Sequence, residues 1–159
     1  GFQEFKVSSW TDNCDALLRL MTSVTCLAGE TQLGKVLKHA RNEQRSYKID
    51  ALVFVGDSFE EDIDSIGNVA GELGLLGLPF FMFQEGFDPI TAFTFQQIAS
   101  LTGGAFHSFD SSSADVLLNL LRAVAIYASG GYKALEAHAK REGGDTLLLS
   151  HQLNRKISG

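Results

Sequence analysis

The chain has 159 residues, 45% of them hydrophobic, and a formal net charge of −6 from 13 basic and 19 acidic residues. This length suits one domain with a real core, and the acidic balance argues against a dedicated nucleic-acid or anionic-membrane surface. No apolar stretch approaches the ~18 residues of a membrane span. Cys14 and Cys26 have no zinc or C-x-x-C spacing, so we expect reduced thiols in a cytoplasmic protein.

The first third of the chain predicts one strand and two helices. Apolar and polar residues nearly alternate over Phe2–Val7, which is typical of a half-exposed edge strand. The apolar stripe over Ala16–Val24 predicts a helix. A second helix is expected to begin at Thr31, with these residues facing inward: Leu33, Val36, Leu37 and Ala40.

The most informative stretch is Ala51 to Asp64, with the sequence ALVFVGDSFEEDID. Its apolar residues predict that Ile49–Val55 is a buried strand, after which Gly56 allows a turn. Asp57 then stands at the carboxyl end of that strand. Because ligands bind at this edge of open α/β sheets, Asp57 is a candidate metal or substrate group.

A helix is expected directly after this strand, from about Phe59 to Leu73. Ser58 and Glu61 match the S-x-x-E capping box, in which each side chain would bond a backbone N–H of the helix start. The acidic residues Glu60 to Asp62 suit the positive end of the helix dipole. They therefore indicate a helix start more than a ligand set.

Two further strands follow. Leu78–Phe83 is a fully apolar strand, and Gln84 and Glu85 follow at its carboxyl end. Asp88 and Pro89 predict the N-cap and first residue of a helix that reaches Leu101. Gly103 and Gly104 then turn the chain into a short strand, Ala105–Phe109.

The remainder is predicted to be helical. Ser112 or Ser113 caps a helix with a broad apolar face, and a glycine pair, Gly130 and Gly131, ends it. A helical pattern over Tyr132–Lys140 and an apolar patch over Leu147–Leu153 follow. We therefore divide the chain into an α/β domain, residues 1–131, and a helical C-terminal tail, residues 132–159, packed on it.

Alternation of strands and helices predicts the fold class. We expect an α/β fold with a doubly wound, mainly parallel sheet and helices on both faces. The sheet includes the strands Ile49–Val55, Leu78–Phe83 and Ala105–Phe109.

Several segments together resemble the von Willebrand factor A (VWA) family. The sequence A-G-E-T-Q-L-G-K-V-L, which contains Thr31, is similar to the family's threonine segment, and V-F-V-G-D, which ends at Asp57, is similar to its third metal-binding segment. The later segments G-L-P-F-F-M-F and I-A-S-L-T-G-G-A-F-H-S-F resemble its next two strands. The likeness covers roughly Phe2 to Ser129 and implies that Thr31 and Asp57 are metal ligands.

The family's first metal-binding segment, D-x-S-x-S after the first strand, is absent from this sequence. We therefore expect a VWA-like domain that is N-terminally incomplete and lacks the strand beside Ile49–Val55. Mg²⁺ or Mn²⁺ needs more oxygen ligands than Thr31 and Asp57 supply. The resemblance thus implies a vestigial or incomplete metal-ion-dependent adhesion site, with metal binding weak or absent in this chain alone.

The resemblance implies a non-catalytic protein-interaction module of a bacterial protein. Its partner would bind around Thr31, Asp57, Ser58 and Glu85, and the partner's acidic side chain would complete the cation's coordination. The alternative is a phosphohydrolase or phosphotransfer enzyme that uses Asp57, although no lysine follows the strands at Leu78 and Ala105. A structural fragment that only assembles with itself is a third class.

The expected absence of a first strand also bears on partners. An unpaired apolar edge at Ile49–Val55 favours a homodimer or association with a missing N-terminal segment, and the patch Leu147–Leu153 offers a further covering element. Nucleic acid and membranes are not expected partners. The histidines, including His107, are scattered and predict no catalytic or metal site.

Overall fold

The computed structural model describes residues 33–44, 49–58, 61–110, 112 and 114–158. The predicted strand Phe2–Val7, the predicted helix Ala16–Val24 and Thr31 lie outside these residues. In the described part, helix α2 (Leu33–Glu43) precedes a parallel sheet of strands β1 (Leu52–Gly56), β2 (Phe80–Glu85) and β3 (Ala105–Phe109). Helices α3 (Ile63–Leu75) and α4 (Pro89–Thr102) connect the strands, and α5 (Ala114–Glu142) and α6 (Gly144–Ser158) follow.

The α/β class and the parallel sheet are confirmed. The strands lie in the order β1-β2-β3 and pair in parallel, with Leu52 opposite Phe80 and Phe81 opposite Ala105. The bounds of β3 are those predicted, whereas β2 starts two residues later than predicted and continues through Gln84 and Glu85. These two polar residues belong to the strand and do not follow it, because they keep the parallel pairing with β3.

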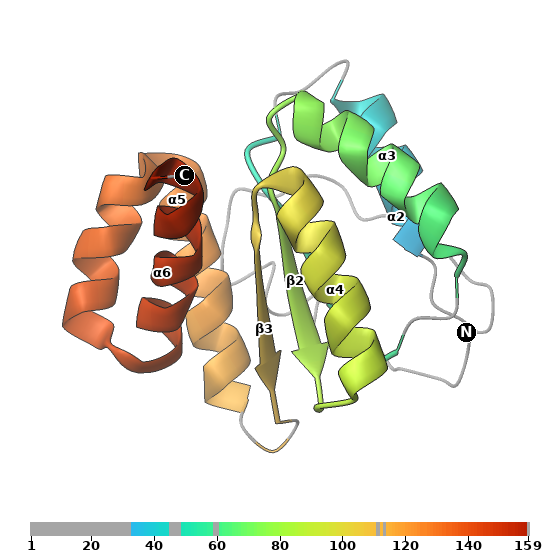
Figure 1. Cartoon of the computed structure of the whole chain (residues 1–159). Coiled ribbons are helices and arrows are strands. Elements are labelled where there is room, and N and C mark those ends of the chain that lie inside the picture. Colours follow the sequence, from blue (N-terminus) through green and yellow to red (C-terminus); the bar gives the residue numbers. More distant parts are fainter. Residues whose placement is uncertain (1–32, 45–48, 59–60, 111, 113, 159) are drawn as a thin grey trace.

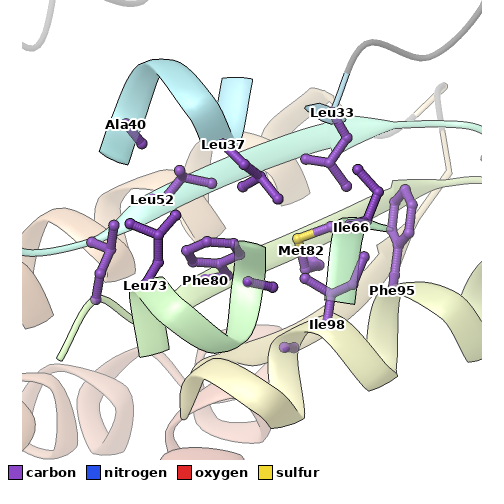
Figure 2. Packing of buried hydrophobic residues seen from close by; sticks show 13 residues of the cluster. Leu33, Leu37, Ala40, Leu52, Ile66, Leu73, Phe80, Met82, Phe95 and Ile98 are labelled. Atoms are coloured by element: carbon purple, nitrogen blue, oxygen red, sulfur yellow. The ribbon is translucent and has the colours of Figure 1, made fainter. Parts of the chain in front are cut away.

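Helices cover both faces of the sheet (Figure 1). On one face, alternate strand residues such as Leu52, Phe80 and Met82 pack with α2, α3 and α4, as Figure 2 shows. The other alternate residues, Phe81 and Phe83 among them, pack with α5 and α6. Both connecting helices lie on the same face, so the described strands are wound in one direction, and double winding stays a prediction.

Helix α2 confirms its predicted inward face, since Leu33, Leu37 and Ala40 are buried. The predicted start of α4 is also confirmed. The Asp88 side chain accepts a hydrogen bond from the Thr91 N–H, and a proline occupies the first turn. Gly103 ends the helix in the left-handed region with φ 75°.

The chain after Gly131 packs against the sheet. Gly131 has φ 79° and ψ −173°, so it interrupts α5 where the sequence predicts a break. Leu135, Leu149 and Leu153 beyond it are buried in the same cluster as the strand residue Phe83. The tail therefore contributes to the core on the side of β3.

Candidate functional site at the carboxyl edge of the sheet

Three carboxylates gather where the three strands end. Asp57 directly follows β1, Glu85 is the last residue of β2, and Asp110 directly follows β3. Because the strands are parallel and in register, their ends lie at one edge of the sheet. A hollow of about 310 Å³ is lined by Asp57, Glu85, Gly86, Phe87 and Asp110.

The turn after β2 shapes the rim of this hollow. Gly86 has φ 93°, a conformation that strains other residues, and its N–H donates to the Phe109 carbonyl at 2.8 Å. The turn leaves the ring of Phe87 67% exposed. An apolar side chain thus stands beside carboxylates at the sheet edge.

The carboxylates differ in how firmly they are held. Asp110 Oδ1 accepts hydrogen bonds from the Ser112 N–H at 2.9 Å and the Ser112 hydroxyl at 3.0 Å. These hydrogen bonds, the backbone one first, lower the pKa of Asp110 from its ordinary value. Asp57 is exposed, and the Ser58 hydroxyl donates to its Oδ1 over a longer 3.4 Å.

The segment that follows Thr31 meets the loop that follows Asp57. The N–H of Gly34, in the first turn of α2, donates to Glu61 Oε2 at 2.8 Å. A β-carbon at residue 34 would lie 3.1 Å from that oxygen and 3.3 Å from Ile66 Cδ1. Glycine therefore allows the close approach that joins the two segments.

The predicted capping box of Ser58 and Glu61 is wrong. Helix α3 begins at Ile63, later than predicted, and its N-cap is Asp62, whose Oδ2 accepts from the Ser65 N–H at 3.3 Å and hydroxyl at 2.8 Å. Glu61 is engaged by α2 instead. The competing pattern Asp62-x-x-Ser65 is visible in the sequence, but the contact of Glu61 with residue 34 is not.

Within the described ranges, no group of three or more His, Cys, Asp or Glu residues is placed to hold a metal ion. The second carboxylate oxygen of Glu61, Oε1, is buried and has no hydrogen-bond partner. Thr31, the other predicted ligand, lies outside the described residues.

Sequence reasoning missed the role of Gln84. This side chain is fully buried on β2, and its Nε2 donates to the Asp88 carbonyl at 3.0 Å. The contact ties the end of β2 to the first turn of α4. Its Oε1 has no hydrogen-bond partner.

A second hollow, not predicted, lies between β3 and α6. His107 Nε2 is 2.8 Å from Asp145 Oδ1, and the two residues are 38 positions apart in the sequence. The hollow has a volume of about 330 Å³ and is lined by Phe106, His107, Ser108, Leu148, His151 and Gln152. No local pattern could have paired His107 with Asp145.

Comparison of the chain with protein-family models, with curated proteins and with solved structures gave no match. In the described part of the chain, no helix has both the length and the apolar character needed to cross a membrane.

Proposed function

We propose that this chain is a non-catalytic protein-interaction module that binds its partner at the carboxyl edge of the sheet. The observation that carries this proposal is the hollow in which Asp57, Glu85 and Asp110 lie beside the exposed ring of Phe87. On such a surface, the carboxylates orient the partner and select it by charge, and the exposed aromatic ring provides contact area.

A VWA-like, doubly wound arrangement is the second part of the proposal. It is supported by the hydrogen bond between Gly34 and Glu61, which brings the segment after Thr31 to the loop after Asp57. By resemblance, Thr31 and Asp57 would contribute to a cation site that a partner's carboxylate completes. The site would be vestigial or incomplete in this chain alone.

Calorimetric titration with MgCl₂ and MnCl₂ tests the cation part. We expect weak binding or none, because hard cations need several oxygen ligands. Submicromolar affinity that disappears in Asp57→Ala but persists in Asp145→Ala, at the other hollow, would contradict an incomplete site.

Site-specific photocrosslinking tests the interaction surface. A photoreactive phenylalanine analogue replaces Phe87, and in a control chain it replaces Leu148, which is 54% exposed on α6. In the cells that produce the protein, we expect a defined protein adduct at position 87 that is lost when Asp57→Ala is added. Equal adducts at both positions, or an adduct indifferent to Asp57→Ala, would overturn the proposal.

The enzyme alternative gives a different result. Among the described residues, the lining of the hollow contains no lysine, arginine or histidine, so no basic side chain of the lining could stabilise a transferring phosphoryl group. Hydrolysis of p-nitrophenyl phosphate in MgCl₂ that is abolished by Asp57→Asn would favour the phosphohydrolase and sink the non-catalytic proposal.

A further inference from the structure

Most of the large apolar side chains that face solvent belong to α3, α4 and their adjoining turns. Among the described residues, eight such side chains are exposed, and Leu148 on α6 is the only one outside this region. The other seven are Ile63, Leu75, Leu76, Phe87, Ile90, Phe93 and Leu101. Helices α3 and α4 pack against each other and form one layer of the molecule (Figure 1), and the seven residues belong to these helices or to the turns beside them.

Helix α4 carries the most regular part of this surface. Ile90, Phe93 and Leu101 recur with Gln97 at helical spacing, and the three apolar residues are 79%, 59% and 55% exposed. The opposite side of the same helix is buried in the core through Phe95. A helix that is apolar on both sides is normally covered on both sides.

The charges around α4 favour its own copy as the covering element. Residues 89–102 contain no Asp, Glu, Lys or Arg, although 20% of the whole chain is charged. In a two-fold dimer each residue near the axis meets its own copy, so an uncharged stripe avoids like-charge repulsion. Residues 49–121 contain no Lys or Arg, which argues against a membrane surface, since interfacial helices are rich in both.

The uncharged stripe on α4, formed by Ile90, Phe93, Gln97 and Leu101, is also nearly symmetric about its middle. Ile90 and Leu101 stand at its two ends, with Phe93 and Gln97 between them. An antiparallel second copy of α4 would place Ile90 against Leu101 of the other chain. The end of the layer that carries Asp64 and Asp88 would then face the end of its copy where Glu72 pairs with Arg41.

The available area is that of a stable interface. With about 200 Å² for a fully exposed large side chain, the seven residues leave roughly 900 Å² in solvent. Each partner in a standard interface buries ~800 Å², so these residues together offer enough apolar area for one.

We propose that the chain forms a two-fold homodimer through the α3–α4 layer, with α4 packed antiparallel to its own copy. This surface shares only Phe87 with the hollow at the sheet edge, and none of the α4 residues Ile90, Phe93 and Leu101 lines that hollow. Variants at these three positions therefore test the dimer without changing the proposed partner site.

Sedimentation equilibrium over a wide range of concentration tests the dimer. In the antiparallel arrangement Ile90→Glu places a carboxylate against Leu101 of the other chain, and Phe93→Glu places one against its Gln97. Because each carboxylate would be buried without a cationic partner, we expect each variant to raise the dimer dissociation constant by roughly a hundredfold. Leu148→Glu, at the exposed residue outside the layer, should leave it unchanged. Unaltered melting of the monomeric variants excludes unfolding as the cause.

Crosslinking tests the antiparallel geometry. Ile90→Cys and Leu101→Cys are combined in a chain in which Cys14 and Cys26 are replaced by serine. The two new cysteines are eleven residues apart on one helix, about 16 Å, and cannot bridge within a chain. We expect a covalent dimer on oxidation of the double variant and much less with either single variant.

Three results would overturn the proposal. The first is a wild-type chain that is monomeric at every concentration, and the second is a dimer indifferent to Ile90→Glu. The third is a monomer that sediments with phosphatidylcholine vesicles through the same residues, because this would make the layer a membrane surface.

Discussion

The side-chain amide of Gln152 in α6 makes both hydrogen bonds that a neighbouring strand would make with Phe106 in β3. Its Oε1 accepts from the Phe106 N–H at 2.9 Å, and its Nε2 donates to the Phe106 carbonyl at 2.7 Å. Edge strands need such cover, because an unpaired backbone invites pairing with other chains. A side chain of a helix thus covers this rung of the sheet without a further strand.

Replacing this amide should loosen the attachment of α6. We expect Gln152→Leu to lower the free energy of unfolding by about 1–3 kcal/mol, because two backbone groups at the sheet edge lose their partner. Urea unfolding measures the loss, and hydrogen exchange at the Phe106 amide should accelerate. Gln96→Leu, the same change at an exposed position of α4, is the control, and equal losses in both variants would contradict the pairing.

Two glycines of α3 should respond in opposite directions to the same substitution. A β-carbon at Gly74 would lie 2.8 Å from the Leu101 carbonyl oxygen, so Gly74→Ala must push α3 and α4 apart and destabilise the fold. At Gly71 a β-carbon meets nothing within 4 Å, and Gly71→Ala should stabilise the helix by about 0.5–1 kcal/mol. Thermal unfolding of both variants decides, and a stabilised Gly74→Ala would show that the helices are not in contact there.

Glu61 should stabilise α2 rather than α3. We expect Glu61→Ala to cost about 0.5–2 kcal/mol, the usual range for a lost helix cap, since the Gly34 N–H loses its acceptor. Glu61→Gln keeps an acceptor oxygen and should recover most of this stability. Hydrogen exchange should quicken in residues 33–43 of the Ala variant, and protection lost only in α3 would mean that Glu61 caps its own helix.

Acid should weaken the start of α4 through Asp88. Hydrogen bonds from the Thr91 N–H, first, and the Thr91 hydroxyl lower the pKa of Asp88 from its ordinary value of 3.8. A lowered pKa in the folded state adds stability that is present above 3.8 and is lost as the pH falls further. Asp88→Asn keeps a capping oxygen but cannot titrate, so its stability should fall less than that of the wild type between pH 4 and pH 2. Acid titrations of both proteins, followed by circular dichroism, measure these losses. A larger loss in Asp88→Asn than in the wild type would contradict the prediction.

Local patterns predicted the elements whose partners are close in sequence. The apolar run over Ile49–Val55 predicted β1, because it is short and rich in β-branched and aromatic residues. The turn at Gly103 and Gly104 marked the start of β3. Asp88 and Pro89 marked the start of α4, since capping involves residues only three positions apart.

Long-range partners account for what the sequence could not reveal. Glu61 accepts a hydrogen bond from the backbone N–H of Gly34, 27 residues earlier, and does not cap α3. Gln152 forms hydrogen bonds with the backbone of Phe106, 46 residues earlier. The carboxyl edge was predictable as the place of Asp57 and Glu85, because parallel strands end together. Asp110 follows the predicted strand Ala105–Phe109 in the same way, but the sequence reasoning did not include it in the site.

The distance in sequence between β3 and its amide partner also matters while the protein is being made. Chains emerge from the ribosome N-terminus first, so β3 is complete well before Gln152 has been added. During that interval the nascent sheet presents an open strand to other nascent chains. Until α6 has been synthesised, the nascent chain is therefore open to misassembly along β3, and slow translation of residues 110–152 would lengthen that exposure.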